Sequence, residues 1–206
     1  MPEEGWKMIV KKTEEALDAC LGALGRSGSV LLVPTETVYG LVCAWHDTAA
    51  RARIYQLKHR SENKPFAAFL PSVEAVFSCI PQLPDAARIF AGTFCPGPIT
   101  LVVPDGAGST FGFRIPDHPF ILKLLKACAM PLASTSANRS GMAPALSVAE
   151  ALETIDGEPD VTVDGGVLTP GSKASTVVLV NADSSWKILR EGPVTGAMLE
   201  NAFKGR

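Results

Sequence analysis

The sequence has few charged residues, few aromatic residues and no long hydrophobic run. Charged residues make up 19% and aromatic residues 7% of its 206 residues. Hydrophobic residues make up 47%, which excludes a largely disordered chain, yet the longest apolar runs are far too short to cross a bilayer. Residues 1–5 include no basic segment leading into an apolar stretch, so we expect no secretory signal. These absences predict a cytoplasmic protein with no membrane partner.

Metal-binding and disulfide motifs are also missing. The five cysteines are odd in number and scattered, and no C-x-x-C motif occurs. No two of the three histidines have the i, i+4 spacing that places both rings on one face of a helix. We therefore expect reduced cysteines in apolar surroundings and no protein-built metal site. The cysteines are Cys20, Cys43, Cys79, Cys95 and Cys128.

The charge balance and the missing phosphate loops limit how the chain could bind nucleotides. A formal net charge of −2 gives no support to a dedicated DNA or RNA binder. It does not exclude a local cleft lined by basic residues. The sequence has no G-x-x-x-x-G-K-[ST] loop, and the glycines at 106 and 108 lack the third glycine of a dinucleotide motif. Any nucleotide must be held by another arrangement.

Helical and strand-like segments alternate along the whole chain. No repeat, low-complexity tract or linker interrupts them, and the 18 glycines and 16 prolines are spread throughout. The pattern predicts one domain over residues 1–206, of the mixed α and β class. Expected helices cover 13–24, 48–58, 73–79, 85–94, 120–130, 147–155 and 195–203, and expected strands cover 30–33, 66–70, 99–103, 112–115, 132–134, 161–163, 176–180 and 186–189.

The run Pro34-Thr35-Glu36-Thr37-Val38-Tyr39-Gly40 is the most informative stretch of the chain. It follows the apolar residues 30–33, which have the length and β-branched content of a buried strand. Ligands commonly bind at the carboxyl ends of strands in sheets flanked by helices. Taken alone, a polar turn leaving a strand is an equally good interpretation.

Four further polar clusters follow expected helices and strands. Each has an ordinary explanation: a basic pair at a helix C-terminus complements the helix dipole, and serine or threonine runs form caps and turns. Together they would line a cleft with cations, hydroxyls and an amide, which suits a polyphosphate and a small zwitterion. No nucleophile paired with a base stands out, so positioning and charge neutralisation are the expected mode of catalysis. The clusters are Lys58 with Arg60, Arg114, residues 134–138, and Ser175 and Thr176 with Arg190.

An ordered series of motifs resembles the YrdC-type threonylcarbamoyl-AMP synthases. The resemblance extends over about residues 13 to 195, and the chain resembles the short form that lacks an additional C-terminal domain. The motifs are PTETVYGL (34–41), KHR (58–60) with Pro65 downstream, PGPIT (96–100), FRIPDHP (113–119), STSANRSG (134–141), ASTVV (174–178) and ILREG (188–192).

The resemblance implies a nucleotidyltransferase that makes threonylcarbamoyl-AMP and pyrophosphate from L-threonine, bicarbonate and ATP. Mg²⁺ would arrive with ATP, and the product would pass to a tRNA threonylcarbamoyl transferase complex for modification of adenosine beside the anticodon. The implied fold is a strongly twisted mixed sheet flanked by helices around a concave, basic cavity. This agrees with the α/β order of the expected elements.

The resemblance also assigns roles to single residues. Lys58 and Arg60 would be catalytic, because they can offset charge on the phosphates of ATP. Many relatives have proline where this chain has Ser61, so no catalytic role is transferred to residues 61–69. Arg114 would hold the carboxylate of threonine with two hydrogen bonds. The implied threonine contacts are Thr35, Arg114, Ser134 and Ser175, and the implied ATP contacts are Lys58, Arg60, Ser136, Asn138 and Arg190.

Two alternatives remain open at this stage. Related domains of hydrogenase maturation proteins form a carbamoyl-adenylate from carbamoyl phosphate, usually within much longer chains. A non-catalytic module could instead use the same basic cavity to bind an RNA backbone, and weak RNA binding could also accompany the enzyme activity.

Overall fold

The computed structural model describes residues 9–61 and 64–205. The segment 1–5, where a signal was not expected, lies outside these residues, as does part of the 61–69 loop. Seven helices are described, and they largely follow the expected segments. The helices are α1 (Leu17–Leu24), α2 (Thr48–Leu57), α3 (Val73–Cys79), α4 (Asp85–Phe94), α5 (Pro119–Cys128), α6 (Val148–Thr154) and α7 (Gly196–Lys204).

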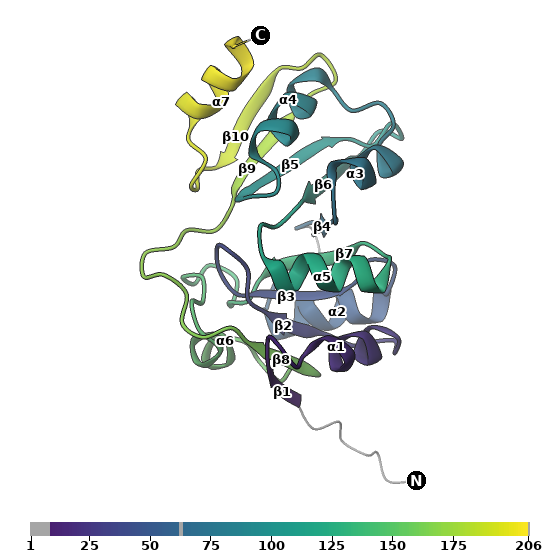
Figure 1. The fold of residues 1–206 in the computed structure, drawn as a ribbon, viewed down its shortest axis with the longest axis vertical. Helices are drawn as coiled ribbons and strands as arrows, with labels where there is room; N and C mark the ends of the chain where they lie inside the picture. The colour runs from purple at the N-terminus through teal and green to yellow at the C-terminus, as the bar shows by residue number, and fades with distance from the viewer. Residues whose placement is uncertain (1–8, 62–63, 206) are drawn as a thin grey trace.

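A mixed sheet of ten strands runs through the described chain in the order β1-β8-β2-β3-β7-β4-β6-β5-β9-β10. Figure 1 shows β1 and α7 near opposite ends of the long axis of the molecule. The mixed sheet with flanking helices confirms the predicted fold class. The strands are β1 (Ile9–Lys12), β2 (Leu31–Val33), β3 (Gly40–Ala44), β4 (Ala67–Phe69), β5 (Ile99–Pro104), β6 (Thr110–Arg114), β7 (Leu132–Ser136), β8 (Val161–Asp164), β9 (Thr176–Val180) and β10 (Trp186–Arg190).

Strand β2 is apolar throughout because helices cover both faces of this part of the sheet. Leu31 and Val33 pack with residues of α1 and α5, whereas Leu32 packs with residues of α2 and α6. Successive side chains of a strand point to opposite faces, so burial on both sides requires a continuous apolar run. This arrangement explains why residues 30–33 show no polar alternation.

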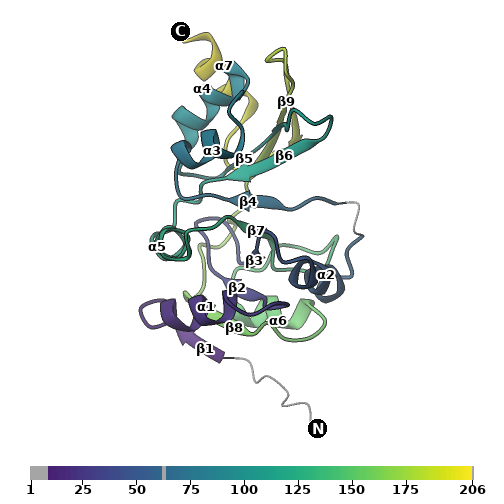
Figure 2. The ribbon, with the colours of Figure 1, turned by 90° about the vertical axis from the view of Figure 1, so that its right-hand side faces the viewer.

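The other half of the sheet is covered by helices on one face only. Figure 2 shows α3, α4 and α7 on one side of β5, β6 and β9, with no described helix on the opposite side. Along β5, Ile99 and Leu101 enter the core beneath the helices, whereas Thr100 and Val102 line a cavity on the open face. Alternation along this strand therefore divides its side chains between the core and a ligand-sized space.

Three details differ from the sequence-based expectations. The helix expected from Thr13 begins at Leu17, because residues 12–15 form a turn in which the Glu15 amide donates to the Lys12 carbonyl. Ala16 is the N-cap and provides no side-chain cap. Strands β1 and β3 were not predicted, and β7 continues two residues beyond Ser134 because its backbone pairs with β3 up to Gly40. No helix among the described residues is long and apolar enough to cross a membrane.

Candidate functional site

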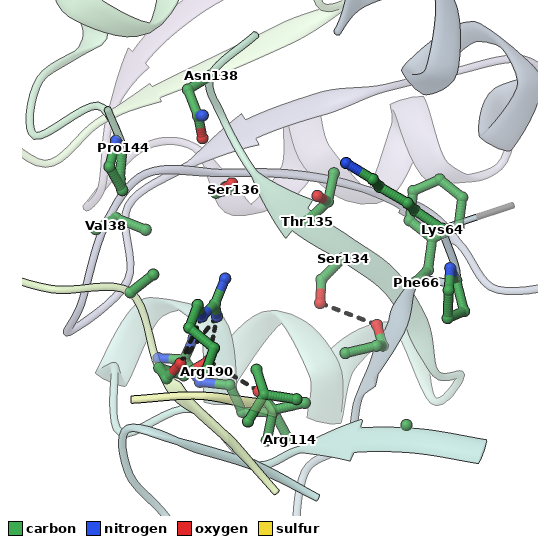
Figure 3. A pocket seen from close by; sticks show the side chains of 18 of the residues that line it. Val38, Lys64, Phe66, Arg114, Ser134, Thr135, Ser136, Asn138, Pro144 and Arg190 are labelled. Atoms are coloured by element: carbon green, nitrogen blue, oxygen red, sulfur yellow. Dashed lines mark hydrogen bonds between the residues drawn. The ribbon is translucent and has the colours of Figure 1, made fainter. Parts of the chain in front are cut away.

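A single cavity of about 780 Å³ brings together all nine residues to which the sequence analysis assigned a role. Figure 3 shows Ser134, Thr135, Ser136 and Asn138 on one side of this cavity and Arg114 and Arg190 on the opposite side. The nine residues come from six segments of the chain, so the sheet topology creates the site. They are Thr35, Lys58, Arg60, Arg114, Ser134, Ser136, Asn138, Ser175 and Arg190.

Lys58 is the C-cap of α2, and its side chain reaches the end of β7. Its ammonium donates hydrogen bonds to the main-chain carbonyls of Ser136 and, over 2.6 Å, of Asn138. Only 2% of the residue is exposed. Burial, together with the nearby positive charges of Arg60 and Lys64, lowers the pKa of Lys58 to about 7. An incoming phosphate would favour the charged form of this lysine.

Arg60 is held by hydrogen bonds and aromatic rings. One terminal nitrogen donates to the Thr135 hydroxyl, and the other donates to the carbonyls of Lys64 and Pro65, at 3.1 and 2.8 Å. The guanidinium carbon lies 5.4 Å from the ring centroid of Phe66, a distance at which a cation interacts favourably with a ring. Burial lowers the pKa of Arg60, but a guanidinium keeps its charge at neutral pH. The site thus holds a fixed positive charge here.

Arg114 ends β6 and reaches the six-residue loop that joins β2 to β3. Its Nη2 donates to Glu36 Oε1 at 2.7 Å and to the Thr37 hydroxyl at 2.8 Å. Its Nε is buried and has no hydrogen-bond partner among the described residues. The Thr35 hydroxyl fixes the same loop, because it accepts from the amides of Thr37 and Val38 at 3.1 and 3.2 Å. The loop therefore orients the arginine through Nη2 and leaves its buried Nε without a partner among the described residues.

Ser175 and Arg190 form one unit, with Arg190 on the same side of the cavity as Arg114 (Figure 3). Arg190 donates through Nε and Nη2 to the Ser175 carbonyl, at 3.0 and 2.8 Å, and through Nη2 to its hydroxyl at 3.2 Å. The Ser175 hydroxyl also lies 2.8 Å from that of Thr100. Burial, together with the positive charge of Arg114, lowers the pKa of Arg190. Arg190, expected on the ATP side, thus contacts a residue expected on the threonine side.

Ser134 and Asn138 lie near the end of β7, and they differ in which of their polar atoms have hydrogen-bond partners. The Ser134 hydroxyl donates to the Ala67 carbonyl at 2.9 Å. The amide of Asn138 donates to the carbonyls of Arg139 and Met142, at 2.9 and 2.8 Å. Its Oδ1 is buried and has no partner among the described residues. Asn138 therefore keeps an acceptor that a ligand hydroxyl or amino group could satisfy.

Several residues that complete the site had no predicted role. Thr135 and Lys64 line the cavity, whereas Glu36 and Thr37 accept hydrogen bonds from Arg114 without being part of the lining. Thr135 lies within a motif already recognised, but its contact with Arg60 depends on strand pairing. Thr100 lies near the start of β5, after the Pro-Gly-Pro turn. Its side chain is on the face of β5 that helices leave uncovered, and the sequence does not show which face that is.

The cavity is strongly positive. Its lining includes five cationic side chains, and no described aspartate or glutamate is part of that lining. No group of three or more potential metal ligands occurs among the described residues. Cations, hydroxyls and a free amide acceptor suit a ligand that carries several phosphates together with a second small polar molecule. The cations are Lys58, Arg60, Lys64, Arg114 and Arg190.

A mixed sheet with a cation-lined cavity on its uncovered face defines a class of protein suited to anionic ligands. The chain belongs to the Sua5/YciO/YrdC family, which is described as "Telomere recombination". The sequence model of this family matches residues 23–192. A mouse protein named threonylcarbamoyl-AMP synthase is 37% identical over 193 residues, covering 86% of this chain and 67% of the mouse protein. A Bacillus subtilis protein of the same name is 30% identical, covering 91% and 57%.

Solved structures agree with this family. Pyrococcus abyssi Sua5 carrying the H234A and Y235A substitutions has a TM-score of 0.84 at 29% identity, covering 95% of this chain and 63% of that one. Pyrococcus abyssi Sua5 complexed with L-threonine has a TM-score of 0.82, covering 96% and 60%. Escherichia coli YciO, at 22% identity and a TM-score of 0.71, supports the fold alone. The chain thus spans less than two thirds of either Sua5 chain.

Proposed function

We propose that this protein is an L-threonylcarbamoyladenylate synthase, a nucleotidyltransferase that uses L-threonine, bicarbonate and ATP. The observation that carries the proposal is that all nine residues assigned to these substrates line one cavity. The name threonylcarbamoyl-AMP synthase of relatives that are 30–37% identical supports it, as does the likeness to a structure with bound L-threonine. The continuous sheet supports a single domain over residues 1–206.

The reaction has two bond-forming steps. The amine of threonine joins the carbon of bicarbonate with loss of water, and the resulting carbamate oxygen attacks the α-phosphorus of ATP. The bond from that phosphorus to the bridging oxygen breaks, and pyrophosphate leaves. Negative charge shifts toward the leaving group, so fixed cations that contact the phosphates lower the barrier.

The cationic side chains divide between the two substrates. Lys58 and Arg60 contact the phosphates, while Ser136, Asn138 and Arg190 hold the rest of the nucleotide. Mg²⁺ that arrives with ATP would help these residues to offset the negative charge of the phosphates. Arg114 receives the carboxylate of threonine through its unused Nε, and the other threonine contacts come from Thr35, Ser134 and Ser175.

Release of pyrophosphate tests this proposal. The purified chain with Mg-ATP should release it only when both L-threonine and bicarbonate are present. Release that needed neither of them, together with AMP transfer that carbamoyl phosphate supports, would favour the hydrogenase-maturation type of reaction instead. RNA binding without any turnover of ATP would favour the binding-module alternative. The names and identities of the relatives favour neither alternative.

Further parts of the proposal concern the cellular setting. We place the protein in the cytoplasm and expect the product to pass to a tRNA threonylcarbamoyl transferase complex. Weak RNA binding in the basic cavity remains an expectation that salt-dependent titration with tRNA can measure.

A further inference from the structure

Arg114 differs from the other cations of the cavity in having a carboxylate partner. Its Nη2 lies 2.7 Å from Glu36 Oε1, and the side chains are only 7% and 17% exposed. None of the other four cations that line the cavity has a carboxylate within hydrogen-bond distance among the described residues. The positive charge of the cavity is therefore uneven, with one compensated cation and a group of uncompensated ones.

The partners of the uncompensated cations are neutral. Lys58 donates to main-chain carbonyls, and Arg60 donates to a hydroxyl and to carbonyls beside an aromatic ring. No carboxylate among these partners offsets their positive charge toward a ligand. The phosphate groups of a nucleotide together carry several negative charges, so they gain most where positive charge is not already neutralised.

Glu36 contacts Arg114 from outside the lining of the cavity, so its negative charge acts through space on a ligand bound at Arg114. A free amino acid is a zwitterion, with a carboxylate and an ammonium group separated by one carbon. The charge of Glu36 opposes the attraction of Arg114 for the carboxylate but favours the ammonium, so its effects on the two ends of such a ligand partly cancel. A phosphate has no cationic end, and a buried carboxylate close to its site repels it strongly.

The state of Glu36 supports such a role. Its second oxygen, Oε2, is buried and has no hydrogen-bond partner among the described residues. A carboxylate used only to fix the position of Arg114 would be more stable with both oxygens bonded, because an unpaired buried acceptor is destabilising. Thr37 already fixes Arg114 through its hydroxyl at 2.8 Å. Orientation of Arg114 therefore does not account for the negative charge of Glu36.

We propose that Glu36 determines the charge preference of the Arg114 subsite, admitting an amino-acid zwitterion and excluding phosphate groups. This inference rests on the proposed function, in which Arg114 receives threonine. Glu36 would in this way prevent ATP, pyrophosphate or free phosphate from occupying the amino-acid position, while the same anions bind at Lys58 and Arg60.

Competition between threonine and inorganic phosphate tests the role of Glu36 without catalysis. Threonine binding is measured by titration calorimetry on the full chain, with and without inorganic phosphate and with no nucleotide present. For the unaltered chain, phosphate should leave the affinity for threonine unchanged. For Glu36→Gln, the same phosphate should weaken the apparent affinity for threonine by about tenfold or more, since the repulsive charge is gone.

Two further variants complete the experiment. Glu36→Asp keeps the charge but moves it away from Arg114 by one methylene group, so phosphate should weaken threonine binding by only about threefold. Glu200→Gln removes an exposed carboxylate that pairs with Lys204 on α7, and it should behave like the unaltered chain. Thermal unfolding of each variant shows whether it folds, and Glu36→Asp carries the test if Glu36→Gln does not.

The possible results separate this inference from the proposed function. If folded Glu36→Gln binds threonine and phosphate still does not compete, Glu36 does not determine the charge preference and the inference is wrong. Competition by phosphate in the unaltered chain would overturn it as well. If the unaltered chain binds no threonine at all, the proposed function fails, and this inference fails with it.

Discussion

The Nζ of Lys58, at the end of α2, donates a hydrogen bond to the main-chain carbonyl of Asn138 across 2.6 Å. The two residues are 80 positions apart in the sequence. This contact joins the Lys-His-Arg motif to the loop that follows β7, and it fixes the lysine in the lining of the cavity. The position of the ammonium group therefore depends on two parts of the fold.

Lys58→Ala should lower the maximal rate of pyrophosphate release even with all substrates saturating. The lysine acts on phosphates whose charge changes during the reaction, so its loss affects the transition state more than binding. Loss of one charge-assisted hydrogen bond corresponds to a decrease of about ten- to a hundredfold. Steady-state kinetics measure this decrease. Lys123→Ala, which removes an exposed lysine of α5, is the matched control. An unchanged maximal rate in Lys58→Ala would remove Lys58 from the catalytic role.

Binding of ATP should weaken as the pH rises above 7. Burial lowers the pKa of Lys58 to about 7, so the free protein loses this positive charge as the pH rises through that value. Phosphates favour the protonated lysine, so the bound form keeps its proton to higher pH. The affinity should then fall by up to about tenfold per pH unit above 7. Titrations with Mg-ATP between pH 7 and 9 measure the slope, and Lys58→Gln should abolish it. The same slope in Lys58→Gln would contradict this explanation.

Arg114→Lys should mainly weaken the binding of threonine. Lysine keeps the positive charge but loses the planar set of donors that contacts Glu36 and Thr37 and leaves Nε for the ligand. The Michaelis constant for threonine should rise by about tenfold or more, while that for ATP stays nearly constant. Kinetic titrations of both substrates measure the two constants. A weaker interaction with ATP at unchanged threonine affinity would show that the division of the cavity is wrong.

Gly192→Ala should destabilise the protein and disturb the threonine side of the cavity. A Cβ atom at residue 192 would lie 2.4 Å from the Ala174 carbonyl oxygen and 2.8 Å from the Ser175 carbonyl carbon. The backbone must shift, at a cost of about 1–3 kcal/mol in the free energy of unfolding. Gly92→Ala is the control, because a Cβ at that position in α4 meets no atom within 4 Å. Chemical denaturation compares the two. Equal stability would mean that the contact at residue 192 relaxes freely.

Much of the fold could be predicted because the hydrophobic period is locally clear. The expected helix at 73–79 and that at 85–94 agree with α3 and α4. Strand β3 was not predicted although Leu41–Cys43 form an apolar run, because the polar residues just before it are typical of a loop. Strand β1 gives a weak pattern, with two lysines at its end. The order of strands could not be predicted, because β1 pairs with β8 across about 150 residues of sequence.

The candidate site was predictable as a set of residues but not as a set of contacts. Motif resemblance selected nine residues, and all nine line one cavity. The pairing of Arg114 with Glu36 joins residues 78 positions apart, and it depends on β6 ending opposite the loop after β2. The placement of Arg190 against Ser175 likewise depends on the β9–β10 hairpin and the turn that follows it. Such contacts arise from the tertiary fold, which local sequence patterns do not determine.

The central claim is that this protein joins threonine, bicarbonate and ATP in one product, and a mass spectrum of that product tests it most directly. The chain is incubated with Mg-ATP, L-threonine and ¹³C-labelled bicarbonate, and the adenylate is analysed before it hydrolyses. We predict a species with the mass of threonylcarbamoyl-AMP that is one mass unit heavier than the product from unlabelled bicarbonate. An adenylate that lacks the labelled carbon, or whose mass does not change when another amino acid replaces threonine, would contradict the account.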